Sequence, residues 1–166
     1  KQSIANVCMS LINKGDEVVI PTPYWVSYSA MVSLADGIPV FVHPHEDANY
    51  KVTAEQLESA ITEKTKMIMF NSPNNPSGSV FSEEEYLAFS KVLQNYPNII
   101  VVSDEIYEHI NYGSKSVSFA SLPGMYERTV TVNGISKAFA MTGWRIGYLA
   151  APKVIAKACN KMQGQI

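Results

Sequence analysis

Short apolar runs alternate with longer amphipathic stretches along most of this 166-residue chain. The runs have the length and the β-branched composition of buried strands. We expect six strands, at residues 18–20, 40–42, 66–70, 99–102, 129–132 and 146–151. Short apolar strands that alternate with amphipathic helices favour a mostly parallel sheet covered on both faces, because parallel strands need crossover helices. The pattern therefore predicts a three-layer α/β/α fold in a single domain.

The segments between these runs carry apolar residues at helical spacing. We expect helices at residues 4–12, 24–34, 53–61, 82–93 and from 152 onward. Thr53 with Gln56, and Ser82 with Glu85, match the capping box that opens a helix. Ligands of such folds collect beyond the carboxyl ends of the strands, so polar residues that follow a strand are the candidates for chemistry.

Residues 133–147 form a turn rich in small residues between what we expect to be two core strands. This turn carries Lys137 and Arg145, eight residues apart. A buried lysine favours its neutral, nucleophilic form, and an arginine offers a permanent forked cation that suits a phosphate. An amine beside a phosphate anchor suggests pyridoxal phosphate (PLP). The simpler alternative is that Lys137 caps a surface loop.

The same stretch resembles the lysine signature of class I aminotransferases, which reads small residue, apolar residue, Ser-Lys, then Gly-x-Arg-apolar-Gly. The resemblance extends over residues 1–166 and is greatest to aspartate aminotransferases. It implies that Lys137 binds PLP covalently and then moves the α-proton of the substrate. It also implies that Ser136 and Arg145 contact the cofactor, and that burial and Arg145 together keep the Lys137 amine neutral.

Asp104 and Tyr107 follow the fourth expected strand. An apolar strand that ends in Asp-Glu could belong to a nucleotide-binding site, but no Gly-x-x-x-x-Gly-Lys-Ser/Thr loop is present in the sequence. Asp104 could also cap a turn. The aminotransferase resemblance implies that Asp104 faces the pyridine nitrogen and keeps it protonated, and that Tyr107 reaches the 3-oxygen of the ring.

Residues 71–78 form the strongest turn cluster in the sequence and could be no more than a loop. Yet Asn-Asn-Pro-x-Gly at the end of a strand resembles a hallmark of the same family. By that resemblance Asn75 donates to the 3-oxygen of the cofactor and contacts the substrate. The Asn75–Pro76 peptide bond is then a candidate for the cis form.

Trp25 and Lys1 are the remaining candidates for the site. A lone tryptophan often belongs to a core or an interface, but the resemblance matches Trp25 to the aromatic residue that stacks on the pyridine ring. Tyr24 and Tyr28 could be packing residues. In one bacterial branch of the family a Lys-Gln pair opens a helix whose backbone holds the phosphate, and this lysine receives the distal carboxylate of the substrate. Lys1 would then select dicarboxylates, or it is an uninformative first residue.

Other parts of the family pattern differ or lie outside this chain. Gly134 stands where many relatives have a serine on the phosphate. The arginine that clamps the substrate α-carboxylate belongs to a C-terminal small domain, whereas this sequence has only Arg128 and Arg145. We expect a PLP-binding large domain that lacks its first strand and the small domain. Such a piece should bind PLP without transaminating, and the full-length protein should be a homodimer.

Composition excludes several other classes of protein. The net charge of −2 and the pI near 5.9 give no basic surface for nucleic acid or an anionic membrane, and no apolar run approaches a membrane span. Cys8 and Cys159 form no metal or redox motif, which favours a cytoplasmic protein. His43, His45 and His109 lack the spacing of metal ligands and are taken as loop residues. We therefore expect no metal site in this chain. The low charged fraction of 17% suggests that part of the surface is covered by something else.

Aspartate with 2-oxoglutarate is the first-choice substrate pair. Aromatic amino acids and prephenate are alternatives within the class. A PLP-sensing domain of a transcription regulator, which binds the cofactor without turnover, is an alternative from another class. The simplest alternative is an α/β domain without a cofactor, in which Trp25, Asn75, Asp104 and Lys137 would be unrelated in space.

Overall fold

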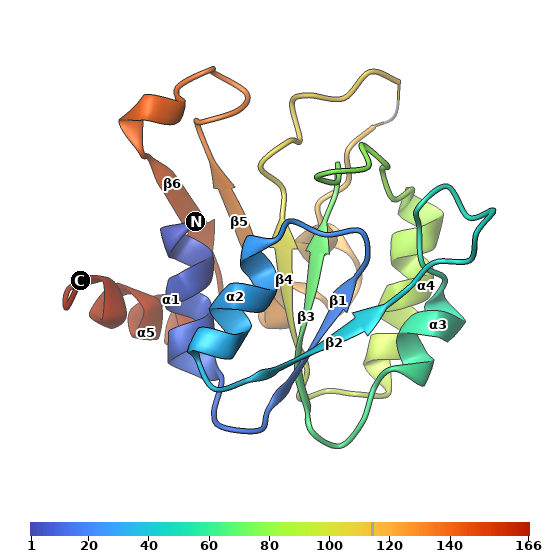
Figure 1. Cartoon of the computed structure of the whole chain (residues 1–166), viewed down its shortest axis with the longest axis horizontal. Helices are drawn as coiled ribbons and strands as arrows, with labels where there is room; N and C mark the ends of the chain where they lie inside the picture. Colours follow the sequence, from blue (N-terminus) through green and yellow to red (C-terminus); the bar gives the residue numbers. More distant parts are fainter. Residues whose placement is uncertain (114) are drawn as a thin grey trace.

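A six-stranded sheet runs through the centre of the protein in the order β2-β1-β3-β4-β5-β6 (Figure 1). The computed structural model describes residues 1–113 and 115–166. Strands β1 to β5 are parallel to their neighbours, and β6 is antiparallel to β5. The strands are β1 (Glu17–Pro21), β2 (Ile38–Val42), β3 (Thr65–Asn71), β4 (Ile100–Asp104), β5 (Thr129–Gly134) and β6 (Gly147–Ala150).

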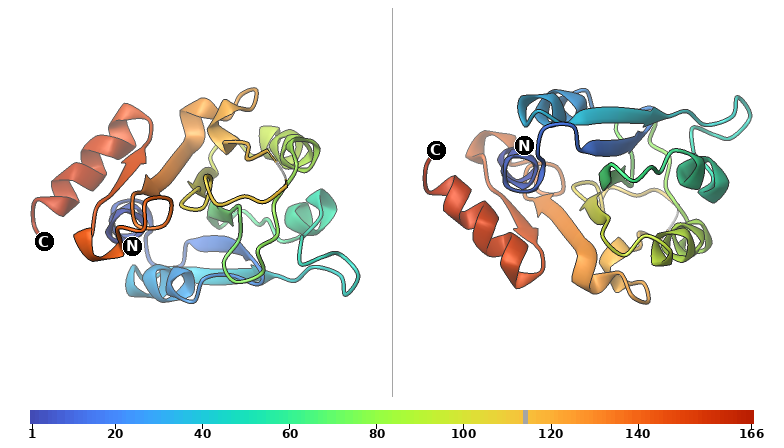
Figure 2. Two further views of the ribbon diagram at one scale, coloured as in Figure 1. Left: turned by 90° about the horizontal axis from the view of Figure 1, so that it is seen from above. Right: turned by 90° about the horizontal axis from the view of Figure 1, so that it is seen from below.

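Helices cover both faces of the sheet, as Figure 2 shows from above and below. The helices are α1 (Gln2–Leu11), α2 (Ser27–Leu34), α3 (Ala54–Ser59), α4 (Glu83–Gln94) and α5 (Lys153–Gln163). One core cluster joins α1, α2 and α5 to the sheet and the other joins α3 and α4 to it. Adjacent residues of β1 divide between the two, because Val18 packs in the first cluster and Val19 in the second. The predicted three-layer fold is confirmed.

Both predicted capping boxes are present, at Thr53 before α3 and at Ser82 before α4. Helix α1 begins two residues before the predicted position 4, and the boundaries of two other helices differ for reasons that the structure shows. Helix α2 begins at Ser27 rather than Tyr24, because the prolines at positions 21 and 23 end β1 and keep residues 22–26 in a loop. Helix α3 ends at Ser59 rather than residue 61, where the amides of the last turn bond to carbonyls three residues back.

The prediction of two core strands around the lysine turn is wrong for β6. This strand lies at the edge of the sheet, and three of its four residues are exposed while Leu149 is half-buried. Close approach of β5 and β6 explains the glycine at 134, since a Cβ there would lie 2.9 Å from the Ile146 carbonyl oxygen. A serine at this position would therefore require the two strands to separate.

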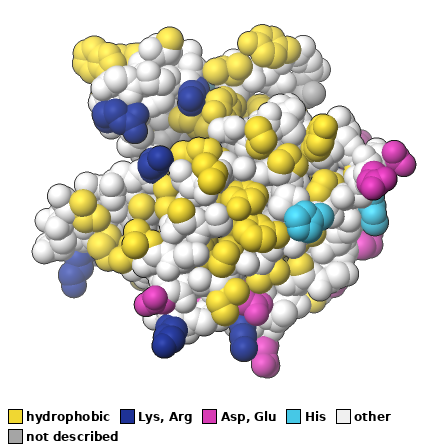
Figure 3. All heavy atoms as spheres, in the orientation of Figure 1, with side chains coloured by type: hydrophobic (Ala, Val, Ile, Leu, Met, Phe, Trp, Pro, Cys, Tyr) yellow, Lys and Arg dark blue, Asp and Glu magenta, His cyan; other side chains and the backbone are white. Residues whose placement is uncertain are grey.

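Hydrophobic side chains remain exposed around this edge. Trp144 is 68% exposed and Tyr148 is 54% exposed, and Phe139 lies on the same β5–β6 connection. Figure 3 shows exposed hydrophobic side chains in the upper part of the molecule, where Figure 1 draws this connection. These side chains fit the prediction from low charge that part of this surface is covered by something else.

Arg128 is buried at the amino end of β5, far along the strand from the lysine turn. Its Nε donates to the Ile99 carbonyl at 2.9 Å and its Nη1 to the Leu93 carbonyl at 2.7 Å. Its Nη2 donates to the carbonyls of Tyr96 and Ile99. The guanidinium thus holds the end of α4 against the start of β4, and its donors are occupied there.

Among the described residues, none of the helices has the length and apolar character needed to cross a membrane. Within the same residues no group of three or more His, Cys, Asp and Glu is arranged to hold a metal ion.

Candidate active site

A cleft of about 760 Å³ opens at the carboxyl ends of the central strands. Its volume lies within the range of small-molecule and cofactor sites in proteins. The eight residues singled out from the sequence all line it: Lys1, Trp25, Asn75, Asp104, Tyr107, Ser136, Lys137 and Arg145. The residue before α1 and the segments at the ends of β1, β3, β4 and β5 therefore bring the predicted groups to one place, as expected for the carboxyl edge of a parallel sheet.

Asp104 is the last residue of β4 and is 6% exposed. Its Oδ2 accepts a hydrogen bond of 2.6 Å from the Tyr28 hydroxyl, and its Oδ1 accepts one of 3.3 Å from the Ile106 amide. Burial raises the pKa of the Asp104 carboxyl, and the Tyr28 hydrogen bond opposes that rise. Asp104 thus shapes the turn after β4 and also presents a carboxylate to the cleft.

Asn71 ties the end of β3 to the end of β4, and its role was not predicted. Its Nδ2 donates to the Asp104 carbonyl at 2.9 Å, and its Oδ1 accepts from the Asn75 amide at 2.8 Å. The two strands pair directly at this level, with Asn71 opposite Asp104. The side chain therefore sets the position of Asn75 relative to the carboxylate. Its only sequence signal is its place as the last residue of a strand.

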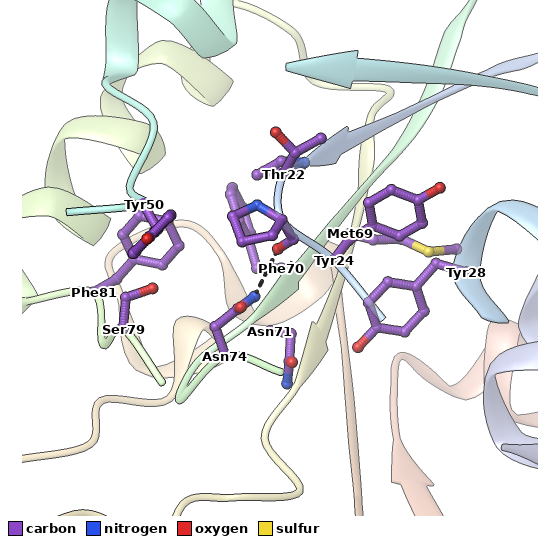
Figure 4. A pocket seen from close by; sticks show the side chains of 12 residues that line it. Thr22, Tyr24, Tyr28, Tyr50, Met69, Phe70, Asn71, Asn74, Ser79 and Phe81 are labelled. Atoms are coloured by element: carbon purple, nitrogen blue, oxygen red, sulfur yellow. Dashed lines mark hydrogen bonds between the residues drawn. The ribbon is translucent and has the colours of Figure 1, made fainter. Parts of the chain in front are cut away.

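The loop that carries Asn75 is also tied to the loop that carries Trp25. The Asn74 Nδ2 donates to the Pro23 carbonyl at 3.2 Å, the bond dashed in Figure 4. A small cavity of about 10 Å³ lies between these loops and shares Tyr28 and Asn71 with the lining of the larger cleft. The Asn75–Pro76 peptide bond is cis, as predicted.

Trp25 lies half-buried between the core and the cleft. Its ring meets the Tyr28 ring edge-on, with centroids 5.5 Å apart and planes at 87°. The Lys1 Nζ lies 5.0 Å from the Trp25 ring centroid, within reach of a cation–π interaction. Lys1, Trp25 and Tyr28 thus line the same cleft. The sequence indicated only a packing role for Tyr28, whereas the structure also places it in this lining.

Lys137 faces Tyr107 across the cleft, with Nζ 5.8 Å from the Tyr107 ring centroid. The lysine is exposed, so its predicted burial is not found in the chain as described. The reason is the position of the turn at the β5–β6 edge of the sheet, which none of the elements in residues 1–113 and 115–166 covers.

Arg145 lies at the other end of the same turn and is exposed. Its backbone is left-handed, with φ of 54°, a conformation that is uncommon for a residue with a side chain. Its Nη1 donates to the Thr142 carbonyl at 2.8 Å. Left-handed residues of this kind gather at ligand sites, and this one directs a cation toward the cleft.

The donor set fits PLP. A primary amine, a buried carboxylate, an amide, an indole face and a guanidinium surround a space of cofactor size. The carboxylate can pair with a pyridinium, the guanidinium with a phosphate, and the indole with a flat ring.

Residues 1–166 match the family described as aminotransferase class I and II. The chain belongs to this aminotransferase family. It is 49% identical over 166 residues to a bifunctional aspartate aminotransferase and glutamate/aspartate-prephenate aminotransferase of Petunia hybrida, covering 99% of this chain and 35% of that protein. It is 48% identical to a probable aspartate/prephenate aminotransferase of Rhizobium leguminosarum, covering 99% and 42%.

Solved aminotransferase structures share the fold. The aspartate aminotransferase of Rhizobium meliloti is 45% identical with a TM-score of 0.96, over 99% of this chain and 42% of that one. The aspartate aminotransferase of Thermus thermophilus with maleate is 41% identical with a TM-score of 0.95, over 99% and 42%. The aminotransferase chain thus spans well under half the length of these relatives.

Proposed function

We propose that the full-length protein containing this chain is a PLP-dependent aminotransferase that moves an amino group between aspartate and a 2-oxo acid. One observation carries the proposal: the side chains of Lys137, Asp104, Asn75 and Trp25 line a single cleft. The membership of the chain in the aminotransferase family supports it. In this proposal residues 1–166 form most of the cofactor-binding large domain.

Each residue of the cleft has a proposed task in binding. Bound PLP supplies an electron-withdrawing ring that takes up the amino group of the substrate. Asp104 would hold the ring nitrogen, Asn75 and Tyr107 the ring oxygen, and Trp25 the ring face. Arg145, Ser136 and the amides at the start of α1 would hold the phosphate, since a helix N-terminus favours an anion.

Lys137 has the reactive part of the task. Its Nζ would bind the cofactor covalently until the amino group of the substrate displaces it. The freed amine would then take the α-proton of the amino acid and return it to the cofactor carbon to which the lysine had been bound. An amine can accept a proton only in its neutral form. Because this lysine is exposed in the described chain, we propose that the cofactor and the rest of the full-length protein cover it.

Lys1 and Trp25 support a dicarboxylate as substrate. The Lys1 ammonium stands over the Trp25 ring at the mouth of the cleft, where it could pair with a distal carboxylate. The Thermus relative was solved with maleate, a dicarboxylate. Prephenate is the second candidate, because the relatives from Petunia and Rhizobium are described as aspartate/prephenate enzymes.

Two properties of the whole protein belong to the same proposal. We propose a homodimer, supported by the exposed hydrophobic side chains around the β5–β6 connection. We also propose a cytoplasmic location, supported by two free buried thiols, Cys8 and Cys159, which suit a reducing compartment.

The cofactor proposal is tested with Lys137→Ala in the full-length protein. Added PLP should give the wild type the visible absorption of a lysine-bound cofactor, and Lys137→Ala should lack it. The matched control is Lys157→Ala, an exposed lysine on α5 outside the cleft, which should keep the absorption. The same absorption in Lys137→Ala would refute the proposal.

The substrate proposal is tested with Lys1→Ala in the full-length protein. The KM for aspartate should rise roughly tenfold, the scale of one charge-assisted hydrogen bond, while the KM for a monocarboxylate aromatic amino acid should stay within about twofold. Rates with 2-oxoglutarate and with prephenate as acceptors would rank the two candidates. An equal rise of KM for both donors would remove Lys1 from substrate selection.

A further inference from the structure

Tyr28 contacts two of the proposed cofactor-binding groups at once. Its hydroxyl donates to Asp104 Oδ2 at 2.6 Å, and its ring meets the Trp25 ring edge-on at 5.5 Å. Tyr28 is 2% exposed and comes from α2, whereas Asp104 ends β4, 76 residues later. One side chain therefore connects the residue proposed for the ring nitrogen with the residue proposed for the ring face.

The hydrogen bond to Asp104 is short and charge-assisted, which makes it one of the stronger kinds in proteins. The phenol can donate a single hydrogen bond, and its acceptor is this carboxylate. Burial raises the pKa of Tyr28 well above its ordinary value, so the phenol stays a neutral donor. The same bond opposes the rise that burial causes in the pKa of Asp104.

Other support for the Asp104 carboxylate is weaker. Its second oxygen accepts one longer bond of 3.3 Å from the Ile106 amide. The further titratable groups near the pair are Tyr86 on α4, Tyr107 after β4 and the α-amino group of Lys1. Among the described contacts neither of these tyrosines forms a hydrogen bond to Asp104, so Tyr28 is the side chain that holds this carboxylate.

We propose that Tyr28 is a positioning residue of the aminotransferase site, whose hydroxyl keeps Asp104 ionised and oriented toward the cofactor ring while its ring supports Trp25. This inference rests on the proposed function. Without the hydroxyl, the proton shared by Asp104 and the ring nitrogen would move toward the carboxylate. The ring would then be held less tightly and would withdraw electrons less strongly.

The test uses Tyr28→Phe in the full-length holoenzyme, because phenylalanine keeps the ring contact with Trp25. We expect the Kd for PLP to rise and kcat to fall, each about tenfold, which is the scale of one hydrogen bond to a charged group. The KM for aspartate should stay within about twofold.

The matched control is Tyr24→Phe. Tyr24 lies four residues earlier, and its hydroxyl donates to Ser29 Oγ at 3.1 Å, outside the cofactor cleft. Figure 4 shows the Tyr24 and Tyr28 hydroxyl groups pointing in different directions. This variant should leave the Kd for PLP and kcat unchanged.

A second measurement separates positioning from packing in the cofactor-free full-length protein. Tyr28→Phe should lower the free energy of unfolding when Asp104 is present. In the Asp104→Ala background the same change should have no effect or should stabilise, because the hydroxyl has lost its acceptor. An equal loss in both backgrounds, or a Tyr28→Phe protein that does not fold, would mean a purely structural role and would overturn the inference.

The outcomes distinguish this inference from the proposed function. A wild type without the absorption of lysine-bound PLP would refute the proposed function and the inference with it. A wild type that binds PLP, together with a Tyr28→Phe variant of equal Kd and kcat, would overturn the inference alone.

Discussion

Arg128 is a buried cation whose hydrogen bonds all go to main-chain carbonyls. Arg128→Ala should lower the free energy of unfolding by about 3 kcal/mol, because buried carbonyls at the end of α4 lose their donor. Urea denaturation monitored by circular dichroism measures this. The control is Arg145→Ala, an exposed residue, which should change the free energy by less than about 0.5 kcal/mol. Equal effects of the two variants would contradict the structural role of Arg128.

Cys8 and Cys159 are buried thiols whose reactivity follows from their surroundings. Burial raises the pKa of Cys8 to about 12 and raises that of Cys159 as well, so the reactive thiolate is scarce near neutral pH. In the native protein both should react with Ellman's reagent far more slowly than a free thiol. Both should react at once after unfolding in urea. A rapid reaction of the native protein with Ellman's reagent would show that α1 and α5 separate easily and expose the two thiols.

The sequence predicted those site residues that belong to local motifs. Lys137 and Asn75 could be recognised because their neighbours in the chain define them. Tyr28 and Asn71 could not, because their partner Asp104 lies 76 and 33 residues away, and only the sheet brings them together. Asn71 stands at the start of a turn cluster and Tyr28 in a helix, and neither local pattern indicates a contact with Asp104.

Glu105 organises the loop that follows β4. Its Oε1 accepts from Ser103 Oγ and Ser118 Oγ, both at 2.9 Å, and from the Phe119 amide at 3.3 Å. The carboxylate is 5% exposed. It therefore joins the start of the loop that carries Tyr107 to Ser118 and Phe119 at the end of that loop. None of these three hydrogen bonds involves Asp104.

Burial raises the pKa of Glu105 above its unfolded value, which gives stability a definite pH dependence. The protonated form is favoured in the folded state, so this contribution is present below the unfolded pKa and is lost as the pH rises through the folded pKa. Glu105→Gln stays neutral and keeps an acceptor oxygen. The wild type should therefore lose stability relative to Glu105→Gln as the pH rises above the unfolded pKa of a glutamate, which is about 4.3.

Urea unfolding over a range of pH values above this pKa measures that difference. The control is Glu58→Gln on α3, whose exposed side chain should give a difference from wild type that varies little with pH. A Glu105→Gln difference that is constant across the range would mean that burial does not penalise the Glu105 charge.

Capping motifs and apolar periodicity predicted most elements because both act within a few residues. The Thr53 and Ser82 boxes satisfy helix amides locally, so their positions could be assigned from sequence. The exposure of β6 could not be predicted from the sequence, because four residues of similar composition can lie at the centre or the edge of a sheet. Their place depends on which strands pair, and that is decided by the whole chain.

The fold of the whole molecule was predictable because one pattern, short strand then helix, repeats along it and permits few topologies. The exposure of Lys137 could not be predicted from the sequence, since it depends on what lies over the β5–β6 edge. The chain spans 35% and 42% of the relatives from Petunia and Rhizobium, and the exposed Phe139 and Trp144 lie at this edge. Burial of the lysine is therefore a property that we expect of the full-length protein.

The 166-residue chain alone should bind PLP but should not transaminate. Binding needs groups that the cleft contains, whereas turnover also needs a cation for the substrate α-carboxylate. The sequence has two arginines, of which Arg128 is held by carbonyls away from the cleft and Arg145 is proposed for the phosphate.

Absorption spectra with PLP would measure binding by the chain alone, and a coupled assay with aspartate and 2-oxoglutarate would measure turnover, with the full-length protein as the reference. We expect lysine-bound cofactor in both proteins and activity in the full-length protein alone, because a clamp contributed from outside residues 1–166 would align the α-carbon with Lys137. Turnover by the chain within about tenfold of the full-length rate would show that such a clamp contributes less than about 1.4 kcal/mol. Lys1 or Arg145 would then have to bind the α-carboxylate itself.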